Sequence, residues 1–162
     1  MNIIIHDREE FAVEDILMDN SIETKVIAYS EKIKPCISCF ACWIKTPGQC
    51  MIKDGYDNMG ELLSRCNKLI IISKNYYGCF SPFVKNVLDR SVCPFILPFF
   101  ETENGETRHP RRYENAINYT VHFYGEITES EKETAEKLVA KIAQKNKRNV
   151  SFYHSFEDIK WI

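Results

Sequence analysis

The chain has 162 residues, a net charge of −2 and a pI near 6.1, and its length suits one domain. This charge balance excludes a general nucleic-acid binder, because no strong positive field attracts phosphates. Hydrophobic residues make up 44% of the chain, which is enough for a core and excludes global disorder. No apolar stretch reaches the roughly 20 residues of a membrane span, and no signal peptide is visible. We therefore expect one cytoplasmic domain over residues 1–162, with no membrane or nucleic-acid partner.

Five apolar runs predict the strands of a sheet: residues 2–5, 24–28, 68–73, 116–123 and 149–153. The run at 68–73 (KLIIIS) is apolar on both faces, which is typical of a central strand in a parallel sheet. We therefore place this run in the middle of the sheet.

Four helices are predicted between these strands, at residues 13–17, 59–66, from 82 onward and from 129 onward. The first is short and rests on the helical spacing of Val13, Ile16 and Leu17. Ser81 and Pro82 form a favourable helix start. Thr128 and Glu131 form a capping box before the last helix.

This alternation of strands and helices predicts a doubly wound α/β fold, a parallel sheet with helices on both faces. In such folds ligands bind beyond the carboxyl ends of the strands. The loops that follow Ile5 and Ser73 are therefore the places where we expect a site. The segment 93–115 is long and irregular, which is typical of a functional, interface or mobile segment.

Four cysteines lie close together in the spacing C-x2-C-x2-C-x7-C: Cys36, Cys39, Cys42 and Cys50. In a reducing compartment, clustered cysteines more often bind metal or do redox work than form disulfides. A cubane iron–sulfur cluster takes four such ligands, and close C-x2-C-x2-C runs are typical of its binding loops. Zinc, and free thiols or a disulfide pair, are the alternatives. The remaining three cysteines are expected in the core: Cys66, Cys79 and Cys93.

Residues 34–92 resemble the flavodoxin-like iron–sulfur flavoprotein and NAD(P)H-dependent FMN reductase superfamily. Its members carry a C-x2-C-x2-C…C segment after the second strand, a Tyr-x-Gly loop after the third, and then a helix ending in Asp-Arg. Besides the four cysteines, the matching residues are Tyr76, Gly78, Asp89 and Arg90. The resemblance implies a flavodoxin-like five-stranded sheet in the order 2-1-3-4-5. It also implies a homodimer or homotetramer.

In that family FMN lies at the carboxyl edge of the sheet, with the loop after the third strand against its ring. The predicted cofactor-binding residues are Asn75, Tyr76, Tyr77, Gly78, His122 and Tyr124. The two tyrosines of the loop would stack on the flavin or merely cover the sheet edge. Asn75 would bind the pyrimidine edge or serve as a turn residue, and His122 has a structural alternative. The four clustered cysteines are the predicted ligands of a [4Fe–4S] cluster.

The loop after the first strand departs from the family pattern. Members place a Gly/Ser/Thr-rich loop there, whose donors hold the FMN phosphate at a helix N-terminus. This chain has His6-Asp7-Arg8-Glu9-Glu10, which lacks those donors and carries three carboxylates. The ring half of a flavin site is therefore recognisable, whereas the phosphate half is degenerate.

Two further segments bear on partners. The run 94–100 (PFILPFF) is too apolar for a solvated loop and predicts self-association, unless part of it tucks under the core. The basic run 108–112 (RHPRR) is a solvated loop or an oligomer contact, or else a phosphate clamp.

Two functions are compatible with these features. The first is an FMN-dependent redox protein, either a flavin reductase using NAD(P)H or an electron-transfer protein with a [4Fe–4S] relay. The second is a degenerate, non-enzymatic relative that has lost the phosphate site and serves as a cluster-binding or interaction module. The loop after Ser73 favours the first, and the loop at His6–Glu10 favours the second. No catalytic residue, electron donor or acceptor can be named from the sequence.

Overall fold

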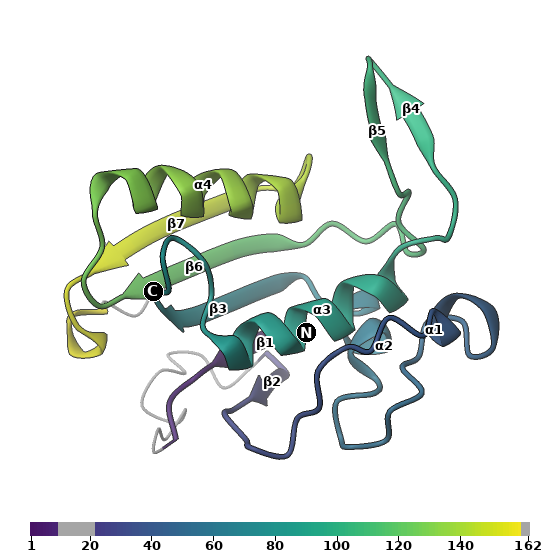
Figure 1. The fold of residues 1–162 in the computed structure, drawn as a ribbon, viewed down its shortest axis with the longest axis horizontal. Helices are drawn as coiled ribbons and strands as arrows, with labels where there is room; N and C mark the ends of the chain where they lie inside the picture. Colours follow the sequence, from purple (N-terminus) through teal and green to yellow (C-terminus); the bar gives the residue numbers. More distant parts are fainter. Residues whose placement is uncertain (10–21, 160–162) are drawn as a thin grey trace. The chain divides into compact units, whose positions relative to one another are not determined.

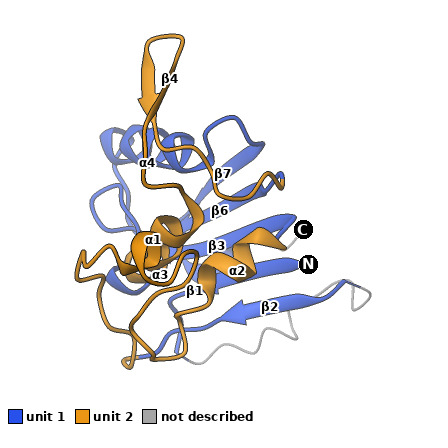
Figure 2. Ribbon diagram, turned by 90° about the vertical axis from the view of Figure 1, so that its right-hand side faces the viewer, with its two compact units in different colours: residues 1–30, 66–84, 116–162 blue, residues 31–65, 85–115 orange. Residues whose placement is uncertain are grey.

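The structure is a computed structural model that describes residues 1–9 and 22–159 (Figure 1). The predicted helix at Val13, Ile16 and Leu17 lies outside the described residues, as does Glu10. The chain divides into two compact units (Figure 2). Unit 1 comprises residues 1–30, 66–84 and 116–162, and unit 2 comprises residues 31–65 and 85–115. That the whole chain forms one domain stays a prediction.

Unit 1 contains a five-stranded sheet whose order is β2-β1-β3-β6-β7. Its strands are β1 (Asn2–His6), β2 (Thr24–Ile27), β3 (Lys68–Lys74), β6 (Asn118–Tyr124) and β7 (Arg148–Tyr153). Every neighbouring pair is parallel, and β3 lies in the centre between β1 and β6. The predicted flavodoxin-like α/β fold and the strand order 2-1-3-4-5, counted within this sheet, are confirmed.

Alternating side chains of the strands bury both faces of this sheet. On one face Ile4 and Ile72 pack with Phe156 and Ile159. Helix α4 (Glu129–Ala143) also belongs to unit 1 and begins with the predicted capping box. It runs beside β7, and the side chains that it buries are small, Ala135, Val139 and Ala143. Small side chains let the helix approach its neighbours closely.

Unit 2 holds the two short helices α1 (Ala41–Ile44) and α2 (Met59–Ser64). It also holds most of α3 (Pro82–Phe95), which begins at the predicted proline. The segment that we expected to be irregular contains an antiparallel hairpin of β4 (Glu101–Glu103) and β5 (Glu106–Arg108). Its turn, Asn104-Gly105, has positive φ at both residues, 53° and 79°, as a two-residue hairpin turn requires. No helix in the described ranges is long and apolar enough to cross a membrane.

Candidate functional site

Five cysteines line one pocket of about 70 Å³ in unit 2. They are the four predicted ligands Cys36, Cys39, Cys42 and Cys50, together with Cys93. Cys36 and Cys39 are exposed, Cys42 is buried, and the other two are half-buried. The sequence therefore predicted a real cluster of thiols but missed its fifth member, which we had expected in the core. Cys93 follows Arg90 by three helical positions, so the two share a face of α3.

The cysteine segment wraps around the pocket through unusual backbone conformations. Ser38 and Phe40 adopt left-handed φ angles of 52° and 53°. Such angles are uncommon outside glycine and often mark a functional loop. Gly48, with φ of 82°, then turns the chain so that Cys50 returns to the pocket. The backbone N–H of Cys50 donates to the Asp57 carbonyl at 3.0 Å, which fixes the end of the segment.

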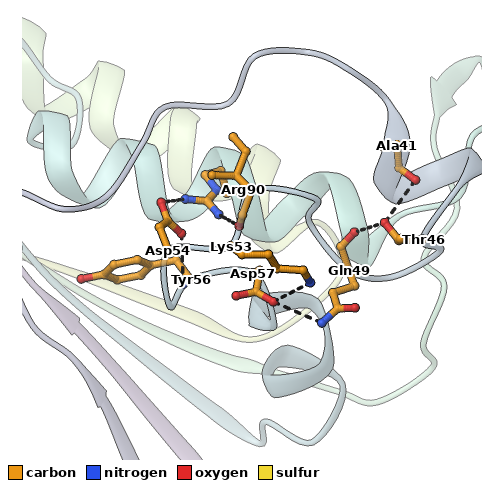
Figure 3. A network of polar contacts seen from close by, with 9 residues as sticks. Ala41, Thr46, Gln49, Lys53, Asp54, Tyr56, Asp57 and Arg90 are labelled. Atoms are coloured by element: carbon orange, nitrogen blue, oxygen red, sulfur yellow. Dashed lines mark hydrogen bonds and ion pairs between the residues drawn. The ribbon is translucent and has the colours of Figure 1, made fainter.

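A buried arginine contacts both ends of this segment, and Figure 3 shows its ion pair with Asp54. The side chain of Arg90 is 0% exposed. Its guanidinium donates to the Lys34 carbonyl at 3.1 Å, to the Ile52 carbonyl at 2.9 Å and to Asp54 Oδ2 at 2.5 Å. Lys34 precedes the first cysteine by two residues, and Ile52 follows Cys50 by two. We call these contacts the Arg90 clasp.

Charge compensation keeps the Arg90 clasp ionised. Burial alone would raise the pKa of Asp54, but hydrogen bonds from Arg90 and from the Lys34 and Tyr56 amides hold it below its usual value. Burial would likewise lower the pKa of Arg90, yet Asp54 and the neighbouring Cys50 raise it. Three acceptors thus compensate the two terminal nitrogens of the buried guanidinium, whereas Arg90 Nε makes no hydrogen bond within the described residues.

The donor set of the pocket suits a soft metal centre, because thiolates favour iron–sulfur clusters, zinc and copper(I). The thiols are not, however, grouped as the ligands of a metal centre would be. Within residues 1–9 and 22–159, no three or more Cys, His, Asp and Glu side chains are grouped to hold a metal ion. Instead, the Cys42 thiol donates to Cys93 Sγ at 3.2 Å. Cys42 would have to leave this partner to join a four-cysteine set.

In unit 1, the loop after β3 is a tight hairpin-like turn over residues Tyr76 to Cys79. The N–H of Tyr76 donates to the Cys79 carbonyl at 3.0 Å, and that of Cys79 to the Tyr76 carbonyl at 2.9 Å. Tyr77 and Gly78 between them have φ of 54° and 78°. A Cβ at Gly78 would meet the Glu131 carbonyl oxygen at 2.7 Å, so only glycine fits there.

The turn exposes two tyrosine rings and is held by hydrogen bonds of Asn75. Tyr77 is 87% exposed and Tyr76 is 42% exposed. Asn75 Oδ1 accepts from the Gly78 amide at 2.9 Å, and Asn75 Nδ2 donates to the Glu126 carbonyl at 2.8 Å. Asn75 therefore holds the turn through both ends of its amide, whereas the tyrosine rings are available to a planar ligand. Their flavin contact stays a prediction.

Asp7 ties the carboxyl ends of three strands of unit 1 together. Its Oδ2 accepts from the Lys74 amide at 2.8 Å, and its Oδ1 accepts from the Tyr124 hydroxyl at 2.8 Å. Burial, and then the charge of Asp7, raise the pKa of Tyr124. A carboxylate thus occupies donors that an anionic ligand at this edge would need. For the described part of the loop, the residues present do not fit an FMN phosphate.

The other predicted edge residue, His122, is buried. Burial lowers the pKa of His122, and its ring lies 5.6 Å from that of Tyr153, centroid to centroid. A pocket of about 210 Å³ opens beside the ends of β6 and β7, lined by Gly125, Tyr153 and His154 among others. This is the edge of a parallel sheet where ligands are expected.

The basic run 108–112 is engaged within unit 2. Arg108 pairs with Glu101 and Glu103, at 3.2 and 2.5 Å. Arg112 Nε donates to the Pro94 carbonyl at 3.1 Å, and the Arg111 guanidinium lies over the Phe95 ring. These contacts favour the structural interpretation of the run over a phosphate clamp.

Comparisons with known proteins agree with this architecture. No protein-family model matches the chain. An iron–sulfur flavoprotein of Methanocaldococcus jannaschii is 33% identical over 76 residues, 46% of this chain and 38% of that protein. The match thus spans well under half of the relative's length.

Among solved structures, an FMN-dependent NADH-azoreductase from Bacillus anthracis in complex with FMN matches with a TM-score of 0.50. Its sequence identity is 9%, over 94% of this chain and 87% of that one, so this likeness concerns the fold. The solved structure thus supports the flavodoxin-like fold, and the partial sequence match is to an iron–sulfur flavoprotein.

Proposed function

We propose that this chain is a flavin-dependent redox protein that binds FMN through its ring and a [4Fe–4S] cluster through Cys36, Cys39, Cys42 and Cys50. The observation that carries the proposal is a pair of sites on one flavodoxin-like chain. Five thiols line a single pocket of unit 2, and exposed tyrosines cap the central strand of unit 1. The printed names of the two relatives, an iron–sulfur flavoprotein and an FMN-dependent azoreductase, support it.

The chain's own residues would bind and orient the cofactors. Tyr77 and Tyr76 would offer their rings to the flavin, and Gly78 would keep the turn against α4. The Arg90 clasp would hold the cysteine segment in its wrapped form. When bound, flavin and cluster supply hydride acceptance and single-electron transfer. We propose NAD(P)H as the electron donor, because the chain resembles the NAD(P)H-dependent FMN reductases.

Tyr77 offers a clean test of ring binding. We expect Tyr77→Asn to weaken flavin binding about tenfold, since aromatic stacking contributes roughly 0.5–1.5 kcal/mol beyond the buried area. Asparagine tolerates the left-handed conformation at this position, so the turn should persist. Titration of flavin fluorescence measures the affinity, with Tyr77→Phe as the matched control that keeps the ring. Equal affinities for all three proteins would reject a stacking role for Tyr77.

A second candidate function rests on Asp7. Its carboxylate takes the Lys74 amide and the Tyr124 hydroxyl, two donors at the edge where a phosphate would be held. This arrangement favours a non-enzymatic relative that keeps the fold and the cysteine pocket as a cluster-binding or interaction module. The two candidates differ in one measurable respect, because only the first binds flavin.

We also propose that the chain self-associates through the end of the run 94–100. Phe95 is buried and lies against Tyr113, whereas Phe99 and Phe100 are 54% and 67% exposed. Exposed neighbouring aromatic residues are typical of contact surfaces.

Replacing Phe99 and Phe100 by serine should weaken self-association at least about 100-fold, because burying each ring is worth roughly 1.5–3 kcal/mol. Light scattering at a protein concentration on the order of tens of micromolar measures the oligomeric state. Ile44→Ser, which alters another exposed apolar residue of unit 2, is the control. A monomeric parent protein would contradict the proposal.

A further inference from the structure

The thiols of Cys42 and Cys93 are held against each other by the elements that carry them. Their sulfur atoms lie 3.2 Å apart, although 51 positions separate them in the sequence. Cys42 lies on α1, and Cys93 lies in the last turn of α3, just before Pro94. The indole Nε1 of Trp43 donates a hydrogen bond to the Cys93 carbonyl at 2.6 Å. The residue that follows Cys42 is therefore hydrogen-bonded to the backbone of Cys93. Two hydrogen bonds thus join α1 to the last turn of α3.

The surroundings make this pair reachable and chemically distinct. Both thiols line the pocket that the exposed Cys36 and Cys39 also line. A lone buried thiol is inert. A thiol in contact with a second one differs, because a mixed disulfide on either sulfur lies beside the other thiol and so meets it at a high effective concentration.

We propose that Cys42 and Cys93 form a reversible disulfide when a small-molecule disulfide is present as oxidant. One protein thiol loses its proton and attacks a sulfur of the reagent, which breaks the reagent's S–S bond and releases one thiol that carries that proton. The second protein thiol then attacks the protein-bound sulfur, which forms the Cys42–Cys93 bond and releases the second reagent thiol. Two electrons pass from the protein thiols to the reagent.

The disulfide would also withdraw Cys42 from the set of four clustered cysteines, a consequence that rests on the proposed function. Cys42 cannot bond to Cys93 Sγ and to a cluster iron at the same time. Oxidised protein should therefore fail to take up a cluster until the bond is reduced. The pair would couple cluster loading to the thiol–disulfide balance around the protein.

The test uses the full chain, reduced and then treated with glutathione disulfide under nitrogen. Free thiols are blocked with N-ethylmaleimide, and disulfide-linked peptides are mapped by mass spectrometry. We expect Cys42–Cys93 to be the dominant disulfide and dithiothreitol to reverse it. Cys93→Ser should abolish the linkage of Cys42, whereas Cys79→Ser, which alters a half-buried cysteine of unit 1, should leave it unchanged. A disulfide joining Cys42 to Cys36, Cys39 or Cys50 while Cys93 stays free would overturn the proposal.

A second measurement separates this inference from the proposed function. Iron and sulfide are counted after anaerobic reconstitution of reduced, oxidised and Cys93→Ser protein. We expect reduced protein and the oxidant-treated variant to load iron and oxidised protein to load none. Loss of iron from the reduced variant would overturn the inference, because Cys93 would then be a ligand. If even reduced wild-type protein takes up no iron, the cluster proposal fails, and the peptide map still decides the disulfide.

Discussion

Replacing Arg90 by methionine should lower the free energy of unfolding by about 3–5 kcal/mol, the usual loss when one partner of a buried ion pair is removed. The substitution leaves Asp54, whose side chain is 7% exposed, without its cation. It also leaves the Lys34 and Ile52 carbonyls without the guanidinium that joins them. Because domains are stable by only about 5–15 kcal/mol, a loss of this size would open the cysteine segment. Urea unfolding at neutral pH measures it.

Two comparisons make this result specific. Arg65→Met removes an exposed pair with Glu61, in which the shortest N–O distance is 2.7 Å, and should cost at most about 1 kcal/mol. Adding Asp54→Asn to Arg90→Met should recover part of the loss, because the orphaned charge is gone. For the same reason, the difference between wild type and Arg90→Met should shrink as the pH falls below about 4, where the carboxyl becomes protonated. An Arg90→Met protein within 1 kcal/mol of wild type, by the urea test above, would contradict the clasp.

Riboflavin should bind nearly as tightly as FMN, within about threefold, because the edge of the sheet offers few hydrogen-bond donors to the phosphate. Asp7 consumes two donors there, and Arg8 is drawn toward Glu157 at 3.7 Å. Each lost charge-assisted hydrogen bond costs roughly 1.5–3 kcal/mol, so losing two weakens FMN binding about 100-fold or more. Titration of the apo-protein with both flavins, followed by fluorescence, measures the ratio.

Asp7→Ser would test the cause. It frees the Lys74 amide and the Tyr124 hydroxyl and removes one negative charge, so FMN affinity should rise about tenfold while riboflavin affinity stays constant. Glu9→Gln is the matched control, since it removes a charge of the same loop without freeing these donors. Nanomolar FMN binding with a large loss for riboflavin would show a phosphate site built from other residues. The arginines of the run 108–112 would then be the first to examine.

The sheet was predictable because its strands are continuous apolar runs and its last helix carries its own start signal. The apolar run at residues 68–73 predicts the buried strand that is observed, and Thr128 with Glu131 forms the capping box that the sequence predicts. The β4–β5 hairpin was missed because its strands are exposed and polar, with no alternation to reveal them. Its Asn104-Gly105 turn was the one signal that could have found it.

The candidate site was predictable only where its residues are neighbours in sequence. The spacing of Cys36, Cys39 and Cys42 is local, so it indicated a shared pocket. Cys93 and Arg90 line the same pocket but lie on a helix some fifty residues further along the chain. No periodicity in the sequence predicts that this helix contacts the cysteine segment. The sequence places Asp7 in the loop that departs from the family pattern, and its effect on a phosphate stays a prediction. Its bonds to the third and fourth strands of the sheet depend on register, which composition does not determine.

The absorbance spectrum of freshly purified protein, prepared without air, tests the central proposal most directly. We expect the bands of a bound flavin together with the broad absorption of an iron–sulfur cluster, the latter lost on exposure to air. Flavin bands without the broad absorption would retain the redox function and remove the relay. A spectrum with neither feature, unchanged after anaerobic supply of flavin, iron and sulfide, would contradict the account and leave the non-enzymatic module as the function of this chain.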